Sequence, residues 1–373
     1  MTPALPLIEL TQAGVSIWLD DLDRHRITSG ELTTLITDSE VRGVTTNPTI
    51  FAKAISGSTS AYADQLRELA ASGADTDVAV RALTTTDVRD ACDVFRPLWE
   101  TSDRVDGRVS IEVDPRLARN TDETILQARL LHGEVDRPNV LIKIPATKEG
   151  LPAITEVLGS GISVNVTLIF SIERYAEVID AWMAGLELAM TRGHNVATID
   201  SVASFFVSRM DSAVDARLDA IGTPEAAALK ARAGLASARL AWGVFQDALA
   251  QPRWATLRDS GARPQRPLWA STGVKDPALP PTMYVMGLVV QGCVNTMPEG
   301  TLQACARDGG FVGDTVSGTQ VESQAVWDAL GDLGISAQEV CVLLENEGVD
   351  KFEVSWQELL DTVSAALKDA RSA

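Results

Sequence analysis

A lysine in the middle of an apolar run is the residue of this chain with the clearest capacity for chemistry. Residues 140–145 read VLIKIP, and Lys143 stands between two isoleucines. Lysine is almost never fully buried without a partner or a task. Burial disfavours the charged ammonium, and the neutral amine attacks ketones and aldehydes to form a Schiff base. The alternative is a buried, purely structural ion pair with Glu112 or Asp20.

Carboxylates and amides at the ends of other apolar segments suit the same chemistry. Side chains alternate along a strand, which places Asp20 and Glu112 each on one face near a strand end. Asp20 can shuttle the proton of a substrate hydroxyl, and Glu112 can activate the water needed to form and hydrolyse an imine. Asn47 and Asn165 are neutral hydrogen-bonding groups suited to sugar hydroxyls, although Asn47, which precedes a proline, can also be a plain turn residue.

The candidate phosphate site is the N-terminus of a predicted helix that carries an arginine in its first turn. In VSRMDSAVDARL, Ser208 and Asp211 have the spacing of a capping box, and Arg209 lies in the first turn. Free N–H groups at a helix N-terminus and a guanidinium bind phosphate well. The alternative for Arg209 is a side chain that faces solvent. Lys275 would add a second positive charge, whereas Lys148 is expected to be a solvated loop residue.

These groups need a scaffold that brings strand ends together, and the pattern of elements supplies one. Short apolar segments alternate with helical patterns, which is typical of an all-parallel α/β sheet. The expected strands cover residues 16–20, 41–46, 108–113, 140–144, 163–170, 202–207, 267–272 and 283–290. The expected helices include one capped by Asn120 with Glu123, one from Ser171 to Gly193, one over about 223–250, and one that begins at a capping box of Ser355 and Glu358.

Periodicity alone does not separate a closed barrel from an open doubly wound sheet. No Gly-rich turn follows the first strand, which disfavours a dinucleotide-binding fold. In a (β/α)8 barrel the carboxyl ends of all strands converge on one rim. The polar residues that would then face a common volume are Asp20, Thr45, Asn47, Glu112, Lys143, Asn165, Thr167, Ser204 and Ser271.

The 373 residues suffice for one enlarged α/β domain or two smaller ones. No Pro/Gly/Ser-rich linker divides the chain, so we expect a single domain over residues 1–373. Extra helices are expected within about 52–107 and 218–262, and a helical tail over about 318–373.

Composition excludes several function classes. The net charge of −19 disfavours nucleic acid and anionic membrane surfaces as partners. No apolar run approaches a membrane span, and the first residues lack the features of a signal peptide. The four cysteines are scattered and only three histidines are present, which argues against a zinc site or a disulfide framework and favours a reducing cytoplasm.

Several spaced motifs together resemble transaldolase, in particular its longer bacterial branch. They are WLDDL, GVTTNPTIF, VSIEVDPRLA, LIKIPAT, SVNVTLIFS, SFFVSRMD and RPLWASTGVKDP, spread over about residues 16–277, and VNTMPEGTL at 294–302 also fits. The order of TTNP and a distant IKIPAT is the most specific part. The resemblance implies a (β/α)8 barrel that works through a Schiff base without cofactor or metal.

The implied reaction moves a dihydroxyacetone unit from fructose 6-phosphate to erythrose 4-phosphate, in the pentose phosphate pathway. The resemblance implies that Lys143 forms the imine, that Asp20 is the acid/base on the C4 hydroxyl, and that Glu112 and Thr167 handle the catalytic water. The implied substrate-binding residues are Thr45, Asn47, Asn165, Ser204, Phe206, Arg209, Ser271 and Lys275.

One departure from the family pattern concerns the phosphate. Many transaldolases place a second phosphate-binding arginine just after the serine of the seventh strand, where this chain has Gly273. Lys275 is the nearest cation and the candidate replacement.

Two rival functions stay open at this point. The first is an aldolase that releases or takes up free dihydroxyacetone. Phe206 disfavours it, because aldolase-type relatives tend to carry tyrosine there. The second is an inert barrel that serves as a binding protein. It is disfavoured because every matched catalytic position keeps its chemical group.

Overall fold

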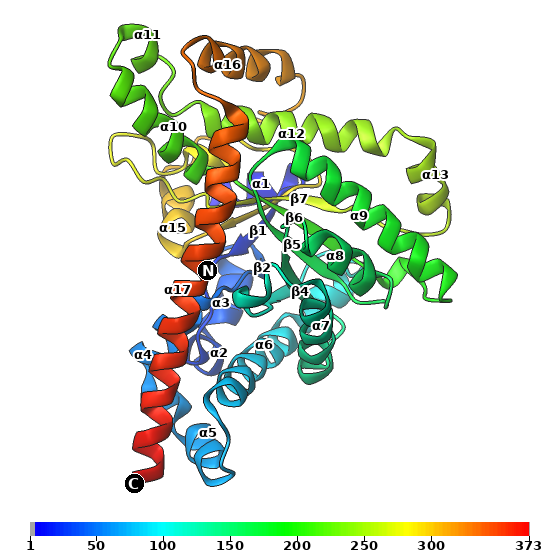
Figure 1. Ribbon diagram of the computed structural model, residues 1–373, viewed down its shortest axis with the longest axis vertical. Coiled ribbons are helices and arrows are strands. Elements are labelled where there is room, and N and C mark those ends of the chain that lie inside the picture. Colours follow the sequence, from blue (N-terminus) through cyan, green and yellow to red (C-terminus); the bar gives the residue numbers. More distant parts are fainter. Residues whose placement is uncertain (1–3, 373) are drawn as a thin grey trace.

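The computed structural model describes residues 4–372 and shows a closed barrel of parallel strands, each paired with the next and the last paired with the first (Figure 1). This confirms the predicted (β/α)8 barrel. The strands are β1 (Ser16–Leu19), β2 (Val41–Val44), β3 (Arg108–Glu112), β4 (Val140–Pro145), β5 (Val164–Ile169), β6 (Ser201–Phe206), β7 (Arg266–Ala270) and β8 (Val294–Met297). The register sets Glu112 opposite Lys143, and Lys143 opposite Asn165, so these side chains form a row on one face.

The eighth predicted strand was wrong. Residues 283–290 begin with a short helix, α14 (Met283–Met286), and β8 lies further along the chain. Both segments are largely buried, and a short apolar run does not distinguish a strand from a buried helical turn. The true strand carries only one large apolar residue at its end, Met297, which is why its apolar signal was weak.

Two helices around the barrel start where the sequence placed their caps. The Asn120 side chain accepts a hydrogen bond from the Glu123 N–H at 3.2 Å at the start of α7 (Thr121–Val135). Ser171 does the same for α9 (Ile172–Thr191). The remaining helices of the first three quarters of the barrel are α1 (Leu5–Gln12), α2 (Arg24–Thr28), α3 (Glu31–Asp38), η1 (Pro115–Leu117), α8 (Gly150–Leu158), η2 (Val196–Thr198) and α10 (Ser208–Ile221).

The helix predicted over 223–250 is divided in two, α11 (Pro224–Ala227) and α12 (Ala233–Leu249). Two carboxylates of α10 bind backbone N–H groups at the break. Asp215 accepts from the Ala231 N–H at 3.0 Å and Asp211 from the Gly234 N–H at 2.8 Å. They act as caps for a new helix start, which the alanine-rich sequence did not reveal.

Further helices lie in the predicted inserts, in the predicted tail and directly after β8. They are α4 (Pro48–Gly57), α5 (Thr59–Ala71), α6 (Thr76–Thr101), α13 (Pro252–Asp259), α15 (Glu299–Asp308), α16 (Gln320–Asp332) and α17 (Ala337–Ser372). The single domain over residues 1–373 stays a prediction, and residues 1–3 and 373 lie outside the described part. Within residues 4–372, no helix is long and apolar enough to cross a membrane.

The long helix α17 begins earlier than the predicted capping box. Ser355 lies in its middle, and the Ser355 hydroxyl bonds with the Thr49 hydroxyl of α4 at 2.6 Å. Val340 and Leu344 are buried, so the apolar stripe of α17 extends from the predicted start towards the N-terminus of the helix. Figure 1 shows α17, in red, running from the neighbourhood of α10 to the α4–α5 pair. Gly348 permits its close approach to the barrel, because a Cβ there would meet Leu168 Cδ2 at 3.1 Å.

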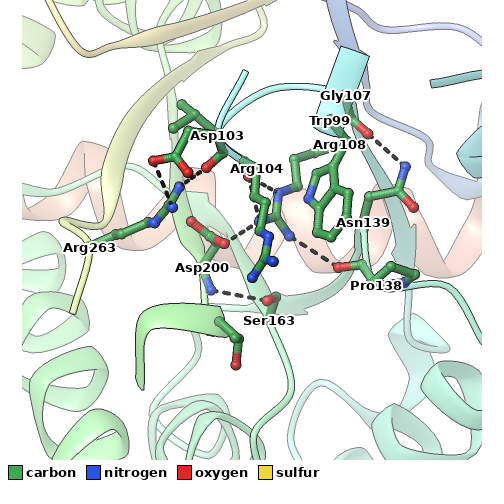
Figure 2. Close-up of polar contacts among 12 residues, drawn as sticks. Trp99, Asp103, Arg104, Gly107, Arg108, Pro138, Asn139, Ser163, Asp200 and Arg263 are labelled. Atoms are coloured by element: carbon green, nitrogen blue, oxygen red, sulfur yellow. Dashed lines mark hydrogen bonds and ion pairs between the residues drawn. The ribbon is translucent and has the colours of Figure 1, made fainter. Parts of the chain in front are cut away.

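The amino-terminal end of the barrel is closed by a network around Arg108, which is 2% exposed (Figure 2). Its guanidinium pairs with Asp200 and donates to the Arg104 carbonyl at 2.7 Å and to the Pro138 carbonyl at 3.4 Å. Asn139 donates nearby to the Gly107 carbonyl at 2.8 Å. Residues at this end of such barrels serve stability, and this network satisfies a buried charge.

Candidate active site

A cavity of about 190 Å³ lies at the carboxyl ends of the strands. Its walls include most of the residues selected from the sequence, namely Asp20, Thr45, Asn47, Lys143, Thr167, Ser204, Phe206, Arg209, Ser271 and Lys275. Glu112 and Asn165 are buried behind this first layer of side chains. The structure also adds residues that the sequence did not suggest, among them Thr296, Pro298 and Phe352.

Lys143 and Glu112 form the centre of the site. Lys143 is 4% exposed; its Nζ donates to the Thr46 carbonyl at 3.2 Å and lies 3.4 Å from Glu112 Oε2. Burial raises the pKa of Glu112 to about 7, against the lowering effect of Lys143. A carboxyl with this pKa is present in both protonation states near neutrality. It is therefore suited to give and take protons beside the amine rather than to be a permanent counter-ion.

A chain of hydroxyl groups runs from Asp20 across the top of the barrel. Thr45 donates to the Asp20 carboxylate at 2.7 Å, and the Thr45 and Thr296 hydroxyls lie 2.6 Å apart. Asp20 follows β1, Thr45 follows β2 and Thr296 belongs to β8, so the chain spans three adjacent strands. The sequence analysis did not select Thr296, because it predicted the eighth strand at residues 283–290, before the segment that contains Thr296.

The two asparagines differ in position. Asn47 caps α4, where its Oδ1 accepts from the Ile50 N–H at 3.0 Å, and it also lines the cavity, so the turn role and the site role coexist. Asn165 is fully buried; its amide donates to the Ser110 hydroxyl at 3.0 Å and accepts from Ser204 at 2.7 Å. Asn165 thus holds Ser204, which does line the cavity.

Strained backbone occurs at two places on the rim. Leu168 has φ 58° where the pairing of β5 with β6 shifts register, and Ser271 has φ 55° directly after β7. Non-glycine residues in this region cost free energy and persist only where the surroundings hold them. The shift in β5 lies next to Thr167, whose buried hydroxyl has no hydrogen-bond partner among residues 4–372. This leaves the Thr167 hydroxyl available for a bound molecule.

Arg209 provides the positive end of the cavity. Its Cζ lies 5.2 Å from the Phe206 ring and 5.9 Å from the Phe352 ring, and its Nη1 is buried without a hydrogen-bond partner within the described chain. Burial lowers the pKa of Arg209. The alternative of a solvent-facing arginine is therefore wrong. Lys275, an exposed side chain after β7, lines the same cavity.

The predicted capping box at the start of α10 was wrong. The Ser208 and Ser271 hydroxyls bond to each other at 2.9 Å. Asp211 turns inward and accepts from the Tyr284 hydroxyl at 2.7 Å as well as from the Gly234 N–H. This carboxylate secures the start of α10, and with it Arg209, to α12 and to α14.

Phe352 of α17 is the main residue that sequence reasoning missed. Its ring lies within 6 Å of both cations, with the centroid 5.7 Å from Lys143 Nζ and 5.9 Å from Arg209 Cζ. The only sequence signal was its place on the apolar stripe of the tail. That signal does not tell which part of the barrel the helix covers.

Comparisons with known proteins agree with the motifs. A profile described as transaldolase/fructose-6-phosphate aldolase matches residues 17–363. A protein of Acidothermus cellulolyticus named transaldolase is 58% identical over 366 residues, which are 98% of each chain. Transaldolases of Thermobifida fusca and Mycolicibacterium smegmatis are each 56% identical, over 362 residues (97% of this chain, 98% of theirs) and 365 residues (98% of each). These matches confirm the resemblance drawn from the sequence, and the chain belongs to the transaldolase/fructose-6-phosphate aldolase family.

Proposed function

We propose that the protein is a transaldolase that moves a dihydroxyacetone unit between sugar phosphates through a Schiff base on Lys143. The donor is fructose 6-phosphate or sedoheptulose 7-phosphate, and the acceptor is erythrose 4-phosphate or glyceraldehyde 3-phosphate. The observation that carries the proposal is the buried amine of Lys143, 3.4 Å from a Glu112 carboxyl that titrates near neutrality, in a cavity with Arg209 in its wall.

The first step is imine formation. The neutral Lys143 amine adds to the C2 carbonyl of the donor, and Glu112 protonates the resulting hydroxyl so that it leaves as water. Thr167, with its free hydroxyl, orients that water. The protonated imine then withdraws electrons from the adjacent carbon–carbon bond.

Cleavage and transfer take place at Asp20. The Asp20 carboxylate takes the proton of the C4 hydroxyl, the C3–C4 bond breaks, and the electron pair moves to the imine to give an enamine. The aldehyde product leaves and the acceptor aldehyde binds. The enamine carbon attacks this aldehyde, Asp20 returns the proton to the new hydroxyl, and water hydrolyses the imine.

The polar walls bind the substrate at both ends. Thr45, Asn47 and Ser204 suit the hydroxyl and carbonyl groups of the three-carbon unit, and Asn165 keeps Ser204 in place. Arg209 binds the phosphate together with Ser271, and Lys275 takes the place of the second arginine. No cofactor or metal is needed for these steps.

The aldolase alternative is less well supported. An aldolase must protonate the enamine before an acceptor arrives. The ring of Phe352 lies near Lys143, and the ring of Phe206 lies near Arg209. Neither phenylalanine has a proton to donate to the enamine. A binding protein without activity would have no use for a carboxyl held near neutrality beside an amine. We place the enzyme in the cytoplasm, as one domain, with neither nucleic acid nor membrane as a partner.

The test measures glyceraldehyde 3-phosphate released from fructose 6-phosphate, with and without erythrose 4-phosphate. Transfer predicts a single turnover per site without acceptor and sustained release with it. Sustained release without acceptor would establish the aldolase. The absence of release under both conditions, with no imine trapped by borohydride, would contradict Schiff-base chemistry altogether.

A further inference from the structure

A second, smaller cavity lies behind Glu112. This rear cavity has a volume of about 50 Å³, and its walls include Asn47, Thr84, Glu112, Leu131 and Trp356. The cavity of about 190 Å³ at the strand ends is the main cavity, and Asn47 lines it as well. Glu112 contacts Lys143, which also lines the main cavity. Asn47 therefore borders both spaces, and Glu112 stands between the rear cavity and the Lys143 amine.

Buried polar atoms without hydrogen bonds belong to residues that line the rear cavity. Both carboxylate oxygens of Glu112 and the Nε1 of Trp356 are buried and make no hydrogen bond among residues 4–372, and Glu112 Oε2 has only the ion pair with Lys143 Nζ at 3.4 Å. Buried polar groups are normally hydrogen-bonded to protein or to ordered water, and leaving one unpaired costs about 1–3 kcal/mol. These atoms offer one donor, the indole N–H, and acceptors on Glu112.

The size of the rear cavity selects the ligand. A cavity needs only about 10–15 Å³ to hold one water molecule. The rear cavity, at about 50 Å³, has room for water but is much smaller than the cavity of about 190 Å³ at the strand ends. Water can accept from Trp356 and donate to Glu112 at the same time.

We propose that the rear cavity binds water and exchanges it with the reaction centre through Glu112. The inference rests on the proposed Schiff-base function. When the Lys143 amine has added to C2, Glu112 gives its proton to the C2 hydroxyl, the C2–O bond breaks, and one water is released. In the reverse step Glu112 takes a proton from water while the water oxygen bonds to C2. A sugar phosphate fills the main cavity during both steps, so the water moves through the rear.

The test follows the oxygen atom. The probe is 4-deoxyfructose 6-phosphate in ¹⁸O-labelled water, because this ketose can form the imine but has no C4 hydroxyl and cannot be cleaved. Its carbon chain therefore stays in the main cavity. Each imine that forms and reverts puts a solvent oxygen into C2 only if the released water escapes. Exchange is measured by mass spectrometry, and the imine is measured separately by borohydride trapping.

Thr84→Leu fills the rear cavity, and Thr85→Leu is the matched control. Both threonines are buried in α6, at 5% and 3% exposure, and each donates to the carbonyl four residues earlier. Thr84 lines the rear cavity, whereas Thr85 does not and instead lines a separate groove beside α6. Leu131→Phe fills the rear cavity from a different wall and serves if Thr84→Leu does not fold.

We expect Thr84→Leu and Leu131→Phe to lower ¹⁸O exchange several-fold while the trapped imine stays at the level of the unchanged protein. Thr85→Leu should leave both quantities unchanged. Exchange at the normal rate in a folded variant with a filled rear cavity would overturn the proposal, since water would then pass through the main cavity. A failure to trap any imine in the unchanged protein would instead contradict the proposed function.

Discussion

The ring of Phe352, near the middle of the last helix, lies 5.7 Å from the Nζ of Lys143, in the fourth strand of the barrel. The same ring lies 5.9 Å from Cζ of Arg209. One side chain of the tail therefore lies against both Lys143 and Arg209, the residues proposed to form the imine and to bind the phosphate. The ring lies beside the place where the proposed enamine would form, so we expect it to keep water from the enamine, and it lies close to the Arg209 guanidinium.

Replacement of Phe352 should change the fate of the enamine. In Phe352→Leu and Phe352→Ala we expect acceptor-independent release from fructose 6-phosphate to rise relative to transfer, because water gains access to the enamine carbon. Loss of the ring beside Arg209 should raise KM for the donor about 2- to 30-fold, the equivalent of about 0.5–2 kcal/mol for a cation–π contact. Val354→Ala, at an exposed position of the same helix, is the control. An unchanged ratio of release to transfer would show that Phe352 has no part in protecting the enamine.

Lys143→Arg should abolish Schiff-base chemistry while the barrel stays folded. Arginine is always charged and offers no nucleophilic amine. We expect no borohydride-trapped adduct and a loss of activity of at least about 10³-fold, since the proposed reaction needs the covalent intermediate on this residue. Circular dichroism checks the fold, and Lys148→Arg, an exposed neighbour in sequence, is the matched control. Near-normal turnover would make Lys143 a structural ion-pair residue.

Glu112→Gln should remove a titration near neutral pH from the rate of imine formation. Burial raises the pKa of Glu112 to about 7, so the protein as it stands should show an inflection there. The variant should be slower by about 10²–10⁴-fold, the usual worth of general acid–base catalysis, and its profile should be flat around that pH. Stopped-flow measurement of imine formation from pH 5 to 9 tests this. An inflection that persists in the variant would have to come from another group.

The same substitution should change how stability depends on pH. The pKa of Glu112 rises from 4.5 in the unfolded chain to about 7 in the fold, so the folded state binds the proton more tightly. This group therefore supports folding most below about pH 4.5, and the support is lost as pH rises through 7. The difference in free energy of unfolding between Glu112→Gln and the unchanged protein should shift in favour of the variant from pH 5 to pH 8. Urea unfolding of both proteins at pH 5 and pH 8 measures this. The same difference in free energy of unfolding at both pH values would contradict the prediction.

Lys275→Ala tests whether this lysine replaces the second phosphate-binding arginine. Lys275 lines the main cavity with Arg209 and Ser271, and its side chain is exposed. We expect KM for phosphorylated donors to rise far more than kcat falls, because the lost contact is made equally in the ground and transition states. The unphosphorylated donor fructose should show no such change. Lys230→Ala removes a lysine from a surface pair with Asp219 and is the control. Unchanged constants for Lys275→Ala would exclude a phosphate role.

Strand periodicity was the most reliable guide in the sequence. Alternation along VLIKIP placed Lys143 on the inner face, and the other strand-end residues converge because all strands of a barrel end at one rim. The fold and most cavity walls were predicted by this rule. The rule failed at the eighth strand, where a buried turn of helix has the same apolar composition as a strand.

Contacts between distant segments could not be predicted from the sequence. Nothing local in the tail tells that Phe352 covers Lys143, since this depends on where Gly348 lets α17 approach Leu168. Asp211 has the right spacing for a cap, yet Tyr284 and Gly234, both remote in sequence, take its carboxylate. Local spacing predicts local hydrogen bonds, and tertiary partners overrode it here.

The path of α17 has a consequence for the order of events during synthesis. Every strand of the barrel leaves the ribosome before residues 337–372 do, and α17 then packs against α4, α5, α6 and α10, elements made much earlier. A nascent chain can therefore hold Lys143 in a nearly complete barrel before Phe352 lies over it. If the proposed reaction holds, we expect transfer between sugar phosphates, as opposed to reaction with any carbonyl compound, to require the docked last helix.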